Sequence, residues 1–332
     1  MSVATARAFP NIALVKYWGK RDETLILPAA GSLSLTLDAF PTTTTVKVGE
    51  ELRQDVFSLN GAPQSGNSLQ RVTDFLDLVR AKSGSRLYAA VHSTNEAPTG
   101  AGLASSASGF AALAVAAAAA YGLELDRAAL SRLARRGSGS AARSLIDAVS
   151  VWHAGEDDES SFAEHVDAPE MAMTIVTVDS RPKQVSSRTA MRATALTSPF
   201  YDAWVASTEQ SLAAMLEACR AGDFSRIGRI TESHALRMHA VIQSADPPIR
   251  YLSPTSIAVF DAVAALREDG IECYATADAG ANVAVISRPG DGERVTAALS
   301  RFGEARLVHP GKGAHLLQET VGGAAVLTGS SN

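Results

Sequence analysis

The chain has 332 residues, of which 46% are hydrophobic and 20% charged, an ordinary globular composition for one large domain or two of average size. Its formal net charge of −5 argues against general nucleic-acid binding, but it leaves room for an anionic small molecule held by local Arg and Lys residues. The N-terminal sequence lacks the pattern of a signal peptide, and the longest apolar run, over 111–120, is too short to span a membrane. Because the two cysteines, Cys219 and Cys273, show no paired metal-ligand spacing, we expect no disulfide framework and a cytoplasmic location.

The first half of the chain reads as a mixture of strands and helices. Strands are predicted over 42–48, 86–92 and 171–178, and helices over 105–121 and 126–136. Alanine, the best helix former, dominates the first of these helices. Asp126 is a suitable N-cap for the second helix, and Gly137 is expected to end it.

The second half is dominated by long helices. Helices are predicted over 199–221, 223–243, 254–268 and 291–301, and strands over 271–277, 282–287 and 305–309. His234 lies on an apolar face of its helix, so we expect it in the core. We predict an α+β fold with two domains, 1–182 and 183–332, divided within the polar, proline-containing loop 179–187. The second domain by itself reads as α/β.

A loop rich in glycine and serine, PTGAGLASSASGF at 98–110, follows a predicted strand and opens the alanine-rich helix. At such a position unpaired N–H groups and the positive end of the helix dipole coincide, which suits a phosphate. The sequence lacks the Gly-Lys-Ser/Thr ending of a P-loop. The alternative is that the small residues only allow close helix packing.

Three further segments could carry chemistry, and each has a structural alternative. In NIALVKYWGK, Lys16 and Lys20 would face one site if the segment were helical, or be solvated lysines on a strand. In RRGSGSAARS, the serines and Arg143 suit a phosphate or carboxylate, although the segment could be a flexible linker. A solvated face is expected for three arginines in or just before this segment, Arg132, Arg135 and Arg136. In ATADAGANVA, Asp278 is either a turn residue or a catalytic carboxylate between two strands.

Together with SSRTAM at 186–191, these segments resemble the GHMP kinase superfamily and, within it, the diphosphomevalonate decarboxylase family. The resemblance covers nearly the whole chain in the family's order. PTGAGLASSAS marks the superfamily, whereas KYWGK with SGSAARS is more specific to the decarboxylases. It implies a two-lobed α+β fold with the active site in the interdomain cleft, a homodimer, and ATP and Mg²⁺ as requirements.

The resemblance also implies roles for individual residues. Asp278 would face the substrate's 3-hydroxyl with Lys16 beside it, and Arg143 would hold the substrate carboxylate. ATP phosphates would lie against Pro98, Gly100, Gly102, Leu103, Ser105 and Ser106. The rest of the substrate, with its diphosphate, would lie against Asn11, Tyr17, Lys20, Ser138, Gly139, Ser140, Arg188 and Met191. No metal ligand is assigned, since Mg²⁺ would be carried by ATP.

The chain departs from the family's usual pattern at Ala30-Gly31, at Asp147-Ala148 in place of a Gly-Gly pair, and at Ala281 in place of proline. Asp147 either faces the cleft, where it would repel a diphosphate, or faces solvent or caps a turn. The expected reaction is decarboxylation of mevalonate 5-diphosphate to isopentenyl diphosphate. The alternatives are the same chemistry on another 3-hydroxy acid, a small-molecule kinase that stops after phosphorylation, and a nucleotide sensor.

Overall fold

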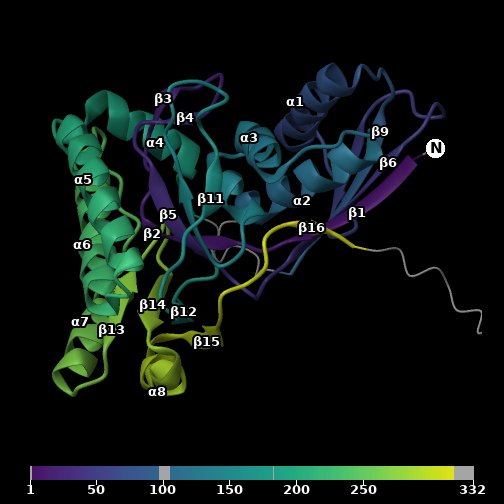
Figure 1. The fold of residues 1–332 in the computed structure, drawn as a ribbon. Coiled ribbons are helices and arrows are strands. Elements are labelled where there is room, and N and C mark those ends of the chain that lie inside the picture. Colours follow the sequence, from purple (N-terminus) through teal and green to yellow (C-terminus); the bar gives the residue numbers. More distant parts are fainter. Residues whose placement is uncertain (1, 97–104, 182, 318–332) are drawn as a thin grey trace, which may run out of the picture.

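The computed structural model describes residues 2–96, 105–181 and 183–317 (Figure 1). Its first sheet has the strand order β16 (His315–Leu316), β1 (Ser2–Ala8), β6 (Thr42–Val48), β9 (Ala89–Asn95), β7 (Val56–Leu59) and β8 (Ala62–Pro63). The second has the order β11 (Ala163–His165), β10 (Val149–Trp152), β5 (Ser32–Thr36) and β2 (Asn11–Val15). The third has the order β13 (Cys273–Thr276), β14 (Val283–Ser287), β12 (Ala172–Thr177) and β15 (Glu304–Val308), and β3 (Lys20–Asp22) pairs with β4 (Leu27–Pro28).

The helices of the first lobe are α1 (Gly66–Ser83), α2 (Ser105–Ala120), α3 (Arg127–Gly137) and the 3₁₀-helix η1 (Gly139–Leu145). Those of the second are α4 (Ser187–Thr197), α5 (Tyr201–Arg220), α6 (Phe224–Gln243), α7 (Pro254–Glu268) and α8 (Gly292–Leu299). Short 3₁₀ turns at Pro289–Asp291 and Ser300–Phe302 flank α8.

The first sheet is covered by helices packed through small residues. Buried and half-buried side chains alternate along β6, as expected for a strand with one face in the core. Helix α2 packs on β1 and β6, and all of its alanines except the half-buried Ala119 are buried, so the helix can lie close to the sheet (Figure 1). This packing fixes the first turns of α2, which contain residues 105–110 of the predicted phosphate loop.

Helix α6 connects two of the sheets. It lies beside α5 and contacts both β2 of the second sheet and β13 of the third (Figure 1). Phe224 and Ile227 are among its buried residues and belong to a core cluster with side chains of both sheets. The second and third sheets therefore share one helix as a common support.

The α+β class is confirmed, and each predicted helix and strand corresponds to an observed one within a few residues. The prediction of an α/β second domain is wrong, because the pairings β13–β14, β14–β12 and β12–β15 are all antiparallel. The division at residue 182 stays a prediction; β12 precedes it and pairs with strands that follow it.

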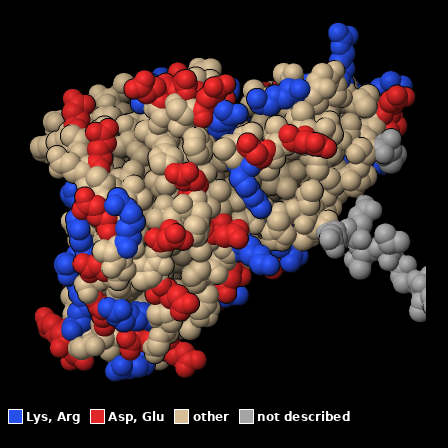
Figure 2. Space-filling model, viewed as in Figure 1, with Lys and Arg blue, Asp and Glu red and all other residues tan. Residues whose placement is uncertain are grey.

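The surface and the cysteines agree with the composition. Acidic and basic side chains are interspersed over the face shown in Figure 2 and do not gather into a basic surface. Among the described residues, no helix is long and apolar enough to cross a membrane. Cys219 and Cys273 are buried and form no disulfide, as predicted.

Candidate active site

A cavity of about 580 Å³ is lined by residues of both halves of the chain. It brings together most of the predicted site: Asn11, Lys16, Tyr17, Lys20, Ser106, Ser138, Gly139, Ser140, Arg143, Arg188, Met191 and Asp278. Of the predicted phosphate loop, Pro98, Gly100, Gly102 and Leu103 lie outside the described residues. Ser105 begins α2.

Lys16 and Asp278 form an ion pair at the wall of this cavity. Lys16 follows directly after β2, and its Nζ donates to Asp278 Oδ1 at 2.6 Å and to the Ala13 carbonyl at 2.7 Å. The lysine side chain is 1% exposed and the aspartate side chain 32%. Burial lowers the pKa of Lys16, and the neighbouring carboxylate opposes part of that shift. The structure therefore holds one shielded ammonium against a carboxylate that remains accessible from the cavity.

The interpretation that Lys16 and Lys20 lie one helical turn apart is wrong, because the segment consists of a strand, a connecting loop and a second strand. This loop contains Gly19, whose φ is +104°. A Cβ added to Gly19 would lie 1.8 Å from the Tyr201 hydroxyl oxygen. Only glycine fits this close approach. Both lysines still line the cavity, with Lys20 Nζ bonded to Glu23 Oε2 at 2.5 Å.

Arg143 is a buried cation on η1 and is 3% exposed. Its Nε donates to Asn11 Oδ1 at 3.1 Å, and Nη1 donates to the Ser32 hydroxyl. Asn11 is itself fixed by its Nδ2, which donates to the Ser140 carbonyl and the Ser144 hydroxyl. Burial lowers the pKa of Arg143 to about 10, so it stays charged at neutral pH. No carboxylate of the described residues lies within ion-pair distance of it, although Asp278 acts on its charge from across the cavity, and a buried cation with no close counterion in this part of the chain suits an anionic ligand.

The hydroxyl of Tyr17 is a second group in the cavity wall that has no partner among the described residues. It is buried and forms no hydrogen bond within the described parts of the chain. The Tyr17 ring packs edge-on against Trp152 with centroids 4.8 Å apart, and a Cβ at Gly139 would come within 2.8 Å of the hydroxyl. Burial raises the pKa of Tyr17, so the group is a hydrogen-bond donor at neutral pH. A phosphate oxygen would satisfy it.

Two cations in the cavity wall were not predicted, Arg71 and Lys183. Lys183 Nζ donates to the Ala279 carbonyl at 3.1 Å and to Ser187 Oγ at 2.7 Å. Among the described residues that line the cavity, Asp278 is the one acidic side chain, and six are cations: Lys16, Lys20, Arg71, Arg143, Lys183 and Arg188. This balance suits a highly charged anion. Lys183 lies in a loop interpreted as a domain boundary, so its local sequence gave no sign of a site.

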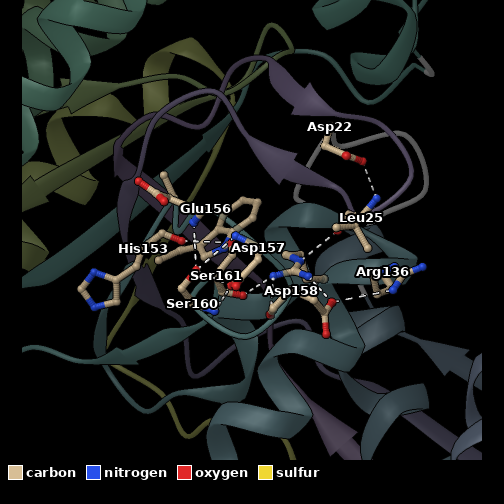
Figure 3. Close-up of polar contacts among 12 residues, drawn as sticks. Asp22, Leu25, Arg136, His153, Glu156, Asp157, Asp158, Ser160 and Ser161 are labelled. Atoms are coloured by element: carbon tan, nitrogen blue, oxygen red, sulfur yellow. Dashed lines mark hydrogen bonds and ion pairs between the residues drawn. The ribbon is translucent and has the colours of Figure 1, made fainter.

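The expectation that Arg135 belongs to a solvated face is wrong. Its side chain is fully buried, and it donates to the Leu25 carbonyl, the Ser161 carbonyl and an oxygen of Asp158. In Figure 3, Leu25, Asp158 and Ser161 lie together at this point, and Arg136 also faces Asp158, with 3.7 Å between Nη1 and Oδ1. Arg135 thus fixes the turn before Ile26, which lines the cavity, so the flexible-linker alternative for this segment is also wrong.

Asp147 does not line the cavity. It is exposed, and its Oδ1 accepts a hydrogen bond from the Gly313 N–H at 2.7 Å. The hypothesis that it repels a diphosphate in the cleft is therefore wrong, and the alternative that Asp147 faces solvent is correct, although its carboxylate holds the distant Gly313 and caps no local turn. The neighbouring Ala148 has a φ of +49°, a left-handed conformation that favours glycine.

Replacing Ala148 by glycine should raise the free energy of unfolding by up to about 1 kcal/mol, because it removes the cost of holding a Cβ in the left-handed region. The backbone bonds at this residue, from its N–H to the Gly311 carbonyl and from the Thr36 N–H to its carbonyl, need no side chain. Urea unfolding of the two proteins measures the difference. Ala154→Gly, at a nearby alanine outside the left-handed set, serves as the control and should not stabilise. A destabilised Ala148→Gly would contradict the reasoning.

Two buried histidines on α6 lie close to the ion pair. His234 Nδ1 accepts a hydrogen bond from the Lys16 backbone N–H at 3.1 Å, and His239 Nε2 lies 3.3 Å from the Ala277 carbonyl. His234 is in the core, as predicted. Burial is the main cause that lowers the pKa of His234 to about 3 and that of His239 to about 4, from an ordinary value of 6.5. Both imidazoles are therefore neutral in the folded protein at neutral pH.

These pKa values predict a loss of stability in acid. Between pH 6.5 and 4 the unfolded chain binds protons at both histidines and the folded chain does not, so the free energy of unfolding falls as the pH falls. Near pH 5 each histidine should contribute a slope of about 1.4 kcal/mol per pH unit. Urea unfolding at pH 7, 6 and 5 measures it, with His92, an exposed histidine, replaced by Gln as the control. If His234→Asn and His239→Gln keep the wild-type slope, the burial argument fails.

Comparison with known families gives two matches that together span most of the chain. Residues 8–163 match a model described as the diphosphomevalonate decarboxylase-like N-terminal domain. Residues 173–314 match one described as the mevalonate 5-diphosphate decarboxylase C-terminal domain. Among curated proteins, the diphosphomevalonate decarboxylase of Candida albicans is 34% identical over 96% of this chain and 93% of its own length. The human diphosphomevalonate decarboxylase is 38% identical over 77% of this chain and 69% of its own length.

Solved structures give the same picture. The mevalonate diphosphate decarboxylase of Staphylococcus aureus superposes with a TM-score of 0.92 at 39% identity, covering 96% of this chain and 98% of its own. That of Enterococcus faecalis gives a TM-score of 0.90 at 44% identity, with 96% and 99% covered. A structure described as MDDEF in complex with MVAPP, AMPPCP and magnesium gives a TM-score of 0.91 at 44% identity, again with 96% and 99% covered. The two-lobed fold expected from the resemblance is confirmed by these matches.

Proposed function

The chain belongs to the diphosphomevalonate decarboxylase family, and we propose that it converts mevalonate 5-diphosphate and ATP into isopentenyl diphosphate, ADP, phosphate and CO₂. The observation that carries the proposal is the cavity in which the Lys16–Asp278 ion pair occurs together with Arg143, a buried cation that has no ion-pair partner among the described residues. The Lys16–Asp278 ion pair suits proton removal from a hydroxyl group, and the Arg143 guanidinium suits the binding of a carboxylate. The described cations around them suit a diphosphate.

The first step is phosphorylation of the 3-hydroxyl. Lys16 binds Oδ1 of Asp278, and within the described residues Oδ2 has no partner, so that oxygen is available to accept the hydroxyl proton. The substrate oxygen then forms a bond to the γ-phosphorus of ATP as the bond to ADP breaks. A tertiary hydroxide is a poor leaving group, and this transfer turns it into phosphate.

The second step is elimination. The bond between C3 and the phosphate oxygen breaks, and carbocation character develops at C3. The bond to the carboxylate then breaks, so that its electron pair forms the alkene and CO₂ leaves. Arg143 would hold that carboxylate in the required plane, since its guanidinium is itself fixed by Asn11 and Ser32. The surrounding cations would stabilise the departing phosphate.

Magnesium would enter with the nucleotide. Among the described residues, no group of three or more His, Cys, Asp and Glu side chains could hold a metal ion. The described cavity lining does offer the carboxylate of Asp278, and this fits Mg²⁺, which commonly takes one or two carboxylates and otherwise phosphate oxygens and water. Bound there, the ion would neutralise developing charge on the phosphates. One of the similar structures contains both magnesium and AMPPCP, an ATP analogue.

The test is ATP turnover over a panel of 3-hydroxy acids with and without a 5-diphosphate, following ADP and CO₂ together. We expect equal amounts of ADP and CO₂ with mevalonate 5-diphosphate. ADP without CO₂ would indicate a small-molecule kinase. Turnover restricted to another 3-hydroxy acid would keep the chemistry and change the substrate, and no turnover with any acid would leave a nucleotide sensor.

Three further properties are the location in the cell, the oligomeric state and the domain boundary. We propose a cytoplasmic homodimer with domains over 1–182 and 183–332. Two buried, unpaired cysteines suit a reducing compartment, and two separate family models match within those ranges, apart from residues 173–182. Light scattering during size-exclusion chromatography measures the oligomeric state.

A further inference from the structure

Helix α6 reaches both members of the Lys16–Asp278 ion pair through its two buried histidines. The ion pair joins residues 262 positions apart, one after β2 and one after β13. Because α6 packs on both of these strands, it is the element best placed to set the distance between them. His234 is fully buried and His239 is 2% exposed.

His234 fixes the backbone of Lys16 through a directional chain of hydrogen bonds. Its Nδ1 accepts from the Lys16 N–H, so the neutral ring carries its proton on Nε2. That Nε2–H donates to Thr208 Oγ1 at 3.2 Å, and the Thr208 hydroxyl donates to the Trp204 carbonyl at 2.8 Å. The Trp204 ring packs against the imidazole with centroids 4.6 Å apart. Every polar atom of the His234 ring is therefore used, and only one tautomer fits.

His239 fixes the other side of the ion pair. A carbonyl only accepts hydrogen bonds, so Nε2 of His239 carries a proton and donates to Ala277, the residue before Asp278. The same turn is held farther along by Ser256, whose hydroxyl donates to the Ala281 carbonyl. A shift of His239 would move the start of the turn and leave its end in place.

We propose that His234 and His239 are positioning residues, which hold the Lys16 ammonium and the Asp278 carboxylate in register from one helix. The proposal rests on the proposed function and deepens it. Neither histidine lines the cavity, so neither touches substrate there. Both act through the backbone, His234 as an acceptor at its δ nitrogen and His239 as a donor at its ε nitrogen.

This difference allows a reciprocal test. The amide of asparagine lies near the position of a histidine Nδ1, and that of glutamine lies near Nε2. His234→Leu and His239→Leu should each lower kcat by about 10- to 100-fold, since a misplacement of about 1 Å can cost that much. His234→Asn and His239→Gln should recover most of this loss, whereas His234→Gln and His239→Asn should not. The KM for mevalonate 5-diphosphate should change less than threefold, because the diphosphate contacts lie on other elements.

The control is Thr231→Val on the same helix. Thr231 is fully buried, and its hydroxyl has no hydrogen-bond partner in the described structure, so this change removes no link and should leave kcat unchanged. Thermal melting of each variant separates lost activity from lost folding. The proposal is wrong if the asparagine and glutamine variants at one position have equal kcat, or if kcat follows melting temperature alone.

A second measurement does not depend on activity. Nitrogen-15 NMR of the histidine rings should show neutral Nε2–H tautomers for both residues at pH 6. An Nδ1–H tautomer at His234 would overturn the proposal. If the wild-type protein shows no ATP-dependent turnover, the proposed function fails, and the NMR result still decides the geometry.

Discussion

Replacing Asp278 by asparagine should lower kcat by about 1,000-fold, the middle of the range for removing a general base. The amide keeps the size of the side chain and can still accept a hydrogen bond from Lys16 Nζ, so the cavity should keep its shape. It cannot accept the proton of the 3-hydroxyl. The KM for the diphosphate substrate should change only a few-fold, because the other cations of the cavity remain.

Initial rates of ADP and CO₂ release measure this effect, and both should fall by the same factor because proton removal belongs to the first step. Asp126→Asn is the matched control. Asp126 caps α3 by accepting a hydrogen bond from the Ala129 N–H, and asparagine caps equally well. A loss of less than tenfold in Asp278→Asn, with the fold intact, would show that another group removes the proton.

The sequence was informative about the site where a local pattern coincided with chemistry. A turn between two apolar strands predicted the position of Asp278, and the cavity brings it to Lys16 and Arg143 as the resemblance implied. Local periodicity also identified long helices such as α5 and α6, because their apolar faces repeat at the helical spacing. The roles of these residues remain predictions.

Other features depended on contacts between distant segments and were not visible in the sequence. Arg135 was grouped with Arg132 and Arg136, which are half-buried, yet it is fully buried because Asp158 and two carbonyls come to it from other parts of the chain. Lys183 lies in an ordinary polar loop, and only the fold brings it to the Ala279 carbonyl. The antiparallel order of the third sheet was missed because β12, which pairs with both β14 and β15, lies before the predicted domain boundary at residue 182. Charge and periodicity describe a residue's neighbours in sequence and not its partners in space.

Replacing Arg143 by lysine should lower the rate of CO₂ release by about 100-fold, although the formal charge is kept. Lysine has no planar fork to hold a carboxylate by two hydrogen bonds, and its three N–H donors sit on one nitrogen, whereas Arg143 binds Asn11 and Ser32 from two different nitrogens. Burial already lowers the pKa of Arg143 to about 10. The same burial would also lower the pKa of a lysine at this position, which weakens the hold on the charge further.

Because Arg143 is assigned to the elimination step, its loss should separate the two products. In a single turnover of Arg143→Lys, ADP should form faster than CO₂, and the phosphorylated substrate should accumulate between them. Arg136→Lys is the matched control, since Arg136 is more exposed and its nearest carboxylate is 3.7 Å away. If ADP and CO₂ slow together, Arg143 acts on phosphoryl transfer and not on the carboxylate. If the excess of ADP over CO₂ persists, the variant acts as a kinase, and the buried guanidinium is the group that makes this fold a decarboxylase.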